Sequence, residues 1–468
     1  MSTSKYQTTP KGIDAFLKRA ATSLNSSESN RNLRDTRATR SLRKFSIKEM
    51  CEFFGLERSA LNHLLQREKA PRGEQVGREV HYSADDMMKL RLLDCVARKR
   101  NYGSQTIFWR KKGDFLPVIV CGSQKGGSGK SITACNLGLW AQLAYGLRVG
   151  IVDADPQATA SLYFADDKVD VGSLDTQTFT NFMGMQEPGE PIVVHDPETL
   201  NSFWKETPWP GIRLLPGGPS IQEGDINLFF LHKNPDPNVP KLYDLLRSAI
   251  QRWDEAHPPT MRPEDVFDEE GNLVEEKYHQ AMTETLDLII IDCAPQLSTT
   301  MLNTIVAGTS IIVPSPLKGF DLSTARAYTT SAYDLISFLS EEEKLTFPPL
   351  PSFILPTIVS QQTSTDLMTL SSLMEQDPGI FCPVFYNRSE AVANAAEHYQ
   401  SLYEFVPPKG KKRSTDNFLR NANAVGDAIL SKCLPHLPPR GFANAFIEET
   451  YQGAIPPWNP EIIKEAAE

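Results

Sequence analysis

The chain has 468 residues, of which 40% are hydrophobic and 23% charged, and its formal net charge is −10 at pH 7. These values fit a globular protein with full cores that is too long for one ordinary domain. No apolar run approaches the ~20 residues that span a bilayer, and the N-terminus has no secretory apolar segment, so we expect a cytoplasmic protein without a membrane partner. The seven cysteines are scattered without C-x-x-C pairs, which argues against disulfides and structural zinc.

The charge is distributed unevenly along the chain. Residues 1–112 hold 24 Lys and Arg against 12 Asp and Glu, a balance of +12, so the remaining residues carry −22. A basic first quarter on an acidic protein favours contact with nucleic acid, and a solvated basic surface is the alternative. Within it, residues 1–44 combine a short amphipathic helix around Phe16 with an arginine-rich arm or linker.

Residues 45–112 are predicted to form a winged helix-turn-helix domain. Ser46 and Glu49 form a capping box that starts a first helix, and Gly55 breaks it. A second helix over residues 58–66 buries leucines, residues 73–82 read as a β-hairpin wing, and a further helix follows Ser83. Many helical hairpins bind nothing, but the wing and the basic charge favour DNA. The side chains predicted to reach DNA from the second helix are Arg58, Ser59, Asn62, His63 and Gln66.

Residues 125–131 (KGGSGKS) follow the apolar run 117–121 and precede a helical pattern. Strand, glycine loop and helix are the context of a phosphate-binding loop, because the loop aims N–H groups at phosphate oxygens. A ligand-free glycine turn is the alternative. Gln124 stands where the general pattern has its first glycine, and Lys125 is an additional lysine. The predicted nucleotide contacts are Lys125, Gly126, Gly127, Ser128, Gly129, Lys130, Ser131 and Ile132.

Strands and helices alternate over residues 113–432, which predicts an α/β fold with a mostly parallel sheet flanked by helices. Asp292 ends the buried run 288–291, and Asp153 and Asp155 end another strand. Together with Ser131, strand-end carboxylates suit Mg²⁺, and one acid could position the attacking water. The alternative is that they cap the turns that follow their strands.

Three further segments carry predictions of their own. Residues 254–276 hold nine acidic residues and one basic residue, and we expect a solvated insertion extending to about residue 285. Residues 433–468 are predicted to be a proline-rich tail that packs on the surface or is disordered. A basic cluster precedes an amphipathic last helix and is either a DNA contact or a solvated loop; its members are Lys409, Lys411, Lys412 and Arg413.

The loop KGGSGKS, then Asp-Ala-Asp-Pro-Gln (153–157), then Ile-Ile-Asp-Cys-Ala-Pro (290–295), resembles the ParA-type partition ATPases of the deviant Walker class. The N-terminal helix-turn-helix is similar to that of the larger members that repress their own operon. The resemblance implies a P-loop NTPase fold, Mg²⁺-dependent turnover of ATP to ADP, and a homodimer in which Lys125 reaches the partner's nucleotide. It implies that Asp155 orients water and that Asp153, Asp292 and Ser131 hold Mg²⁺. It also implies nonspecific DNA binding on the nucleoid, with hydrolysis stimulated by a ParB-type centromere-binding partner.

Other interpretations stay open. Ile132 replaces a hydroxyl residue common in the family, so an α-phosphate contact is missing or moved to Thr133. The protein could be mainly a transcriptional repressor with a nucleotide switch. A MinD-like membrane-cycling ATPase fits less well because the chain ends in a short acidic segment. An iron–sulfur relative would need paired cysteines at the dimer face, which the spacing does not offer.

Overall fold

The computed structural model describes residues 15, 18–20, 42–97, 106–166, 169–171, 173, 175–186, 190–231, 241–296, 298–343, 351–361, 364–377, 379–396, 400–407, 410–456 and 458. The predicted helix around Phe16 is described only at residues 15 and 18–20, which are helical, and the arginine-rich segment lies outside the described residues. Contacts divide the chain into Met1–Ser41 with Asp166–Lys168 and a second unit of Leu42–Ala165 with Val169–Glu468. All features below belong to the second unit.

The strands are β1 (Phe45–Ser46), β2 (Glu74–Val76), β3 (Glu79–Tyr82), β4 (Val118–Cys121), β5 (Val149–Ala154), β6 (Lys205–Glu206), β7 (Ile212–Leu215), β8 (Leu288–Cys293), β9 (Ser310–Pro316) and β10 (Phe353–Thr357). The helices are α3 (Ile47–Phe54), α4 (Arg58–Leu65), α5 (Ala84–Ala97), α6 (Lys130–Tyr145), α7 (Thr159–Phe164), α8 (Phe179–Phe182), α9 (Pro197–Phe203), α10 (Ser220–Leu231), α11 (Leu245–Ala256), η1 (Pro263–Val266), α12 (Glu275–Thr283), α13 (Thr299–Ala307), α14 (Gly319–Glu343), α15 (Ser364–Gln376), α16 (Glu390–Ala396), α17 (Lys412–Cys433) and α18 (Phe442–Tyr451).

The larger sheet has seven strands in the order β10-β9-β4-β8-β5-β7-β6. Every neighbouring pair is parallel except β6 and β7. Strands β4, β5 and β8 are buried along their whole length, as the run of apolar residues in β8 requires when helices cover both faces. The predicted fold class, a mostly parallel sheet flanked by helices, is confirmed.

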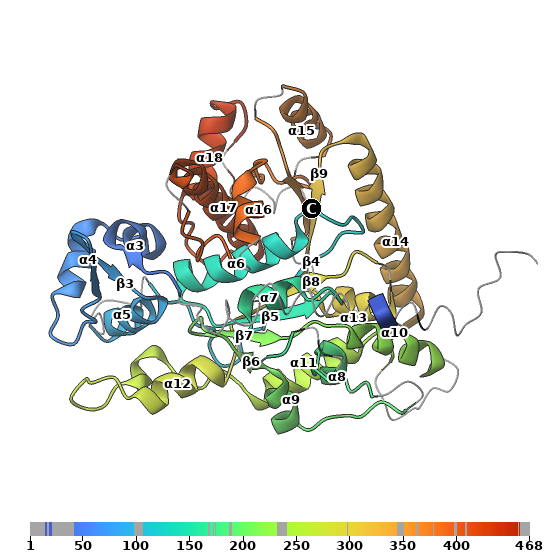
Figure 1. The fold of residues 1–468 in the computed structure, drawn as a ribbon, viewed down its shortest axis with the longest axis horizontal. Helices are drawn as coiled ribbons and strands as arrows, with labels where there is room; N and C mark the ends of the chain where they lie inside the picture. The colour runs from blue at the N-terminus through green and yellow to red at the C-terminus, as the bar shows by residue number, and fades with distance from the viewer. Residues whose placement is uncertain are drawn as a thin grey trace, which may run out of the picture. The chain divides into compact units, whose positions relative to one another are not determined.

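Two hydrophobic cores lie on opposite faces of this sheet. Ile119 and Cys121 of β4 belong to one core, and Val118 and Val120 belong to the other, because successive side chains of a strand point to opposite faces. Helices α6, α17 and α18 contribute to the first core, and α8, α9, α10, α11 and α13 contribute to the second. Figure 1 shows these two groups of helices on either side of the strands.

The N-terminal elements are the helices α3, α4 and α5 and a small antiparallel sheet of β1, β2 and β3, here called the winged region. Ser46 caps α3 through the predicted box with Glu49, and Gly55 ends that helix in the left-handed conformation. Strand β3 pairs antiparallel with β1 and β2, so residues 74–82 form the predicted wing. A second box, Ser83 with Asp86, stands at the start of α5.

This winged region shares a core with the larger sheet. Phe53 of α3 packs edge-on against Trp140 of α6, with ring centroids 6.0 Å apart. The buried guanidinium of Arg91 in α5 donates hydrogen bonds to the backbone oxygens of Thr106 and Leu143. These contacts place the winged region and the sheet in one compact unit. A domain boundary at residues 112/113 therefore stays a prediction.

The acidic segment 254–276 is not simply solvated, and that interpretation is wrong for its apolar side chains. Val266 in η1 is fully buried, and Tyr278 in the following α12 is 7% exposed. Both pack in a core with Met88 and Leu92 of α5, so the segment braces the winged region. The acidic residues of this segment predicted an exposed surface, but the sequence pattern did not predict that its apolar side chains are buried.

The C-terminal segment packs on the surface as far as it is described. Helix α18 buries Ala443 and Ile447, and the Trp458 indole donates a hydrogen bond to the Ala428 oxygen of α17. Helix α17, whose first turn contains Lys412 and Arg413 of the basic cluster, was predicted to be the last helix, and α18 shows that this is wrong. Asp427 explains the arrangement, because its carboxylate accepts N–H groups from Arg440 and Ala443 and fixes the start of α18.

Candidate functional site

The glycine loop connects β4 to α6 at the carboxyl edge of the sheet. Gly127 and Gly129 have φ values of 72° and 99°, which side chains rarely tolerate, so these positions require glycine. A Cβ placed on Gly126 or Gly127 would meet no atom within 4 Å, so the loop backbone has an open face. On its inner side, Thr357 at the end of β10 donates a hydrogen bond of 2.8 Å to the Ser128 oxygen. The loop is thus anchored from inside and accessible from outside.

Lys130 begins α6 and is only 6% exposed. Its Nζ donates a hydrogen bond of 2.9 Å to the backbone oxygen of Lys125 across the loop. Burial lowers the pKa of Lys130, and the negative charge of Asp292 opposes that shift. A buried ammonium at the mouth of a glycine loop is suited to binding a phosphate oxygen.

Lys125 lies on the open side of the same loop. Its side chain is 39% exposed and forms an ion pair with Asp321, whose side chain is 8% exposed. Asp321 lies in the first turn of α14, on the strand-end side of β9. Within one chain, the charge of Lys125 is therefore directed toward α14.

Asp292 is fully buried in β8, in register with Cys121 of β4 and Asp153 of β5. Neither of its carboxylate oxygens has a hydrogen-bond partner of normal geometry among the described residues. Burial, and after it the charge of Asp153, raises the pKa of Asp292 well above its usual range; the nearby Ser131 hydroxyl and the Lys130 charge oppose this only in part. Orphaned carboxylate oxygens beside a helix-start hydroxyl fit a divalent cation that prefers oxygen ligands.

Asp153 differs from Asp292 although the two residues are paired in register. One of its oxygens accepts hydrogen bonds of 2.7 Å from both the backbone N–H and the hydroxyl of Ser161, and the other accepts the Asp155 N–H at 3.2 Å. The Gly217 N–H in turn donates to the Ser161 hydroxyl at 2.8 Å. A Cβ on Gly217 would lie 2.6 Å from the Asp153 carboxyl carbon, so only glycine permits this approach. The Asp153 carboxylate thus has hydrogen-bond partners on both oxygens, whereas the Asp292 oxygens are available to a ligand.

Asp155 lies just beyond β5 and is 8% exposed. One of its oxygens accepts the N–H of Gln157 at 2.9 Å, which fixes the turn after the strand. The group stands at the same sheet edge as the glycine loop, because β5 and β4 both run parallel to β8. This position suits a group that orients water, although the turn-capping interpretation also holds for one oxygen.

The remaining loop positions are partly buried. Ser131 and Ile132 are of intermediate exposure on the first turn of α6. Thr133 is fully buried, and its hydroxyl donates to the Gly129 oxygen at 2.7 Å. That hydroxyl is already engaged within the helix, so the α-phosphate contact considered for Thr133 is not favoured.

The predicted DNA-facing residues divide into two groups. On α4, Leu61 and Leu64 are buried. The five predicted side chains on or after α4 are all exposed: Arg58, Ser59, Asn62, His63 and Gln66. Near the start of α17 the exposed basic residues are Lys411, Lys412 and Arg413, whereas Lys409 lies outside the described residues.

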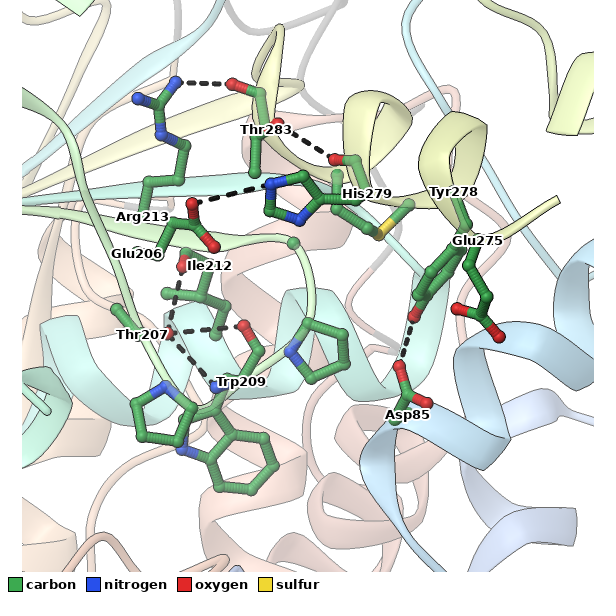
Figure 2. Close-up of a pocket in the computed structure, with 14 residues that line it drawn as sticks. Asp85, Glu206, Thr207, Trp209, Ile212, Arg213, Glu275, Tyr278, His279 and Thr283 are labelled. Atoms are coloured by element: carbon green, nitrogen blue, oxygen red, sulfur yellow. Dashed lines mark hydrogen bonds and ion pairs between the residues drawn. The ribbon is translucent and has the colours of Figure 1, made fainter. Parts of the chain in front are cut away.

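A cavity of about 370 Å³ lies away from this site, between α5, α12 and the turn that precedes β7 (Figure 2). The Tyr278 hydroxyl donates a hydrogen bond of 2.6 Å to Asp85, and His279 faces Glu206 at 3.7 Å. Parallel sheets bind ligands at the carboxyl ends of their strands, and this cavity lies at the amino end of β7. We therefore assign the functional site to the glycine loop and not to this cavity.

Sequence reasoning missed four residues of the site: Ser161, Gly217, Asp321 and Thr357. Each is distant in sequence from the residue it contacts or lies outside the quoted patterns. Among the described residues no group of three or more His, Cys, Asp or Glu side chains could hold a metal by itself. A cation here would need phosphate oxygens in addition to Ser131 and Asp292.

A buried strand, an anchored glycine loop, a buried lysine and a strand-end carboxylate define a phosphate-binding-loop protein. The model of the family described as "CobQ/CobB/MinD/ParA nucleotide binding domain" matches residues 119–402. This match spans more than half of the chain, and the chain belongs to that family.

Curated relatives are similar at low identity. A protein named replication protein A from Sinorhizobium fredii (strain NBRC 101917 / NGR234) is 27% identical over 284 residues, which cover 59% of this chain and 58% of that protein. A second one, from Rhizobium rhizogenes, is 23% identical over 430 residues, 89% of this chain and 94% of that protein. A solved partition protein is 15% identical, covers 84% of this chain and 96% of that chain with a TM-score of 0.52, and supports the fold alone. No described helix is long and apolar enough to cross a membrane.

Proposed function

We propose that the protein is a Mg²⁺-dependent, ParA-type ATPase that segregates a plasmid or chromosome. The observation that carries this proposal is the pairing of the glycine loop with the partnerless, buried carboxylate of Asp292. A structural strand-end aspartate would have hydrogen-bond partners, as Asp153 does. Family membership supports the same nucleotide chemistry.

In this proposal the loop N–H groups and Lys130 bind the phosphates of ATP. Ser131 and Asp292 would hold Mg²⁺, which supplies charge neutralisation of the phosphates when it is bound. Asp155 orients the attacking water. Asp153, predicted from the resemblance to hold Mg²⁺ as well, is assigned instead to keeping β5 in place, because its oxygens accept hydrogen bonds from Ser161 and Asp155. Lys125 acts in trans, on nucleotide bound by the partner in a homodimer.

DNA contact is proposed in two modes. The exposed face of α4 reads an operator, which makes the protein an autorepressor, and the basic residues 409–413 contact any DNA when ATP holds the dimer together. A ParB-type partner accelerates hydrolysis and releases the dimer from nucleoid DNA. Turnover by the purified full-length chain, with and without Mg²⁺, random duplex DNA and the cognate partner, tests the proposal. Turnover that neither DNA nor the partner raises contradicts the partition role.

A second candidate is a repressor in which the nucleotide acts only as a switch. The observation that favours it is the direct packing of the winged region on α6, the helix that starts at the phosphate loop. Operator binding that changes with nucleotide, in a protein whose turnover stays at the unstimulated rate under all conditions, would support this alternative.

A further inference from the structure

The intrachain partner of Lys125 is the starting point. Lys125 is the additional lysine of the loop, and its Nζ donates a hydrogen bond to an oxygen of Asp321, 196 positions away. The loop beside it is open, since neither Gly126 nor Gly127 has neighbours within 4 Å of a Cβ position. A long, flexible lysine side chain on an open surface can adopt many conformations in solvent. The ion pair with the Asp321 carboxylate favours one of these conformations.

The backbone of Asp321 is fixed by its helix. It lies in the first turn of α14 and is 6% exposed, and its N–H donates to the Lys318 oxygen at 2.8 Å. Helix α14 is packed directly against the start of the glycine loop, because a Cβ on Gly122 would lie 2.1 Å from the Tyr328 hydroxyl. The carboxylate therefore has a fixed position relative to the loop.

Separating the pair has a definite cost. Asp321 would lose its cation while its side chain stays largely buried, and burial disfavours a carboxylate that has no partner. The positive end of the α14 dipole offsets part of that cost but does not replace a full charge. Any anion that takes Lys125 away must compete with Asp321.

We propose that Asp321 is a positioning residue that holds Lys125 on its own chain, and that nucleotide bound to a second copy of the chain must displace it. This inference rests on the proposed role of Lys125 in trans. The ion pair between Lys125 and Asp321 raises the protein concentration needed for ATP-dependent dimerisation, because the pair must be broken before the dimer forms. Asp321 touches neither nucleotide in this scheme and acts only through Lys125.

Sedimentation of the full-length chain over a concentration series, with Mg²⁺ and a nonhydrolysable ATP analogue, tests the proposal. Asp321→Asn keeps the shape but removes the charge, so the dimer should form at a several-fold lower protein concentration. Nucleotide affinity of the dilute monomer should not change. Asp334→Asn is the matched control, because Asp334 is an exposed acid on the same helix, and it should leave the midpoint unchanged.

The double variant Lys125→Ala/Asp321→Asn separates positioning from structure. If Asp321 acts through Lys125, the double variant should behave like Lys125→Ala alone, whereas a structural effect of Asn would appear in both backgrounds. Asp321→Ser, which retains a helix-start hydrogen-bond acceptor, repeats the test if Asn lowers the Tm. An unchanged or higher dimerisation midpoint for both single variants overturns the proposal. If Lys125→Ala alone changes neither dimer nor turnover, the role of Lys125 in trans fails instead.

Discussion

The orphaned carboxylate of Asp292 leads to a prediction about stability as well as binding. Asp292→Asn should stabilise the nucleotide-free protein at pH 8, because it removes a buried carboxyl group that has no hydrogen-bond partner among the described residues and that ionises more readily in the unfolded chain. Leaving a buried polar group unsatisfied costs about 1–3 kcal/mol, and more when it is charged. Asparagine keeps part of this cost, so we expect a gain of about 1–2 kcal/mol, which corresponds to a Tm rise of a few degrees.

The pH dependence has a definite sign. Burial raises the pKa of Asp292 in the folded state, so the folded protein binds this proton more tightly than the unfolded chain does. Below the ordinary pKa of about 4, the carboxyl is neutral in both states, and the variant has little advantage. As the pH rises above that value, the wild type loses stability through this group and the variant does not. The difference in Tm should therefore widen from acidic to neutral pH.

Thermal melts of both proteins over this pH range measure the effect, and fluorescent ATP titrations with and without Mg²⁺ measure the loss of function. The matched control is Asp153→Asn, since Asp153 is equally buried and in register but accepts hydrogen bonds from Ser161 and Asp155. Its substitution replaces one of the two acceptor oxygens by a donor and should give a smaller gain or a loss. An Asp292→Asn variant that melts at or below the wild-type Tm at pH 8, or that keeps Mg²⁺-dependent binding, would refute the reasoning.

Four further predictions concern chemistry and DNA. Lys130→Ala should abolish ATP binding in a fluorescence titration, because no other buried cation faces the loop among the described residues. Asp155→Ala should keep ATP binding but lose turnover. Normal hydrolysis by the Asp155 variant would remove this residue from the mechanism. Asn62→Ala should weaken operator binding by about 1–3 kcal/mol with little effect on random duplex, as measured by fluorescence anisotropy. Neutralising the basic residues 411–413 should weaken ATP-dependent binding to all sequences and reduce the salt slope by about one unit for each lost phosphate contact. Equal effects of both changes on both duplexes would contradict two separate modes.

The sheet and its loop could be predicted because their signals are local. A strand of apolar residues, glycines at fixed spacing and a following helical pattern lie close together in the sequence, and the cap residues Ser46 and Glu49 identify α3 in the same way. The acidic segment and the C-terminal helix could not be predicted well. Val266 is buried by α5 residues and Ala443 packs through contacts with α17, and neither contact is visible in the local composition.

The carboxylates show this limit most clearly within the site itself. Asp153 and Asp292 are both fully buried in neighbouring strands and are register partners. The sequence places both at the end of an apolar run and therefore predicts the same role for them. The difference comes from Ser161, which satisfies one of them and not the other. Only a contact between β5 and α7 makes that distinction.

Lys130 and Asp292 are both buried ionisable groups, and their burial is unfavourable in the absence of a ligand. Burial disfavours the charged form of each: it lowers the pKa of the lysine and raises that of the aspartate. Their mutual attraction recovers part of this cost, but Lys130 donates to the Lys125 oxygen, and no hydrogen bond joins it to Asp292. A ligand that offers anionic oxygens to Lys130 and a cation to Asp292 relieves both costs at once. A phosphate group with its divalent ion has that composition, which is why the buried charges are better explained by nucleotide than by packing.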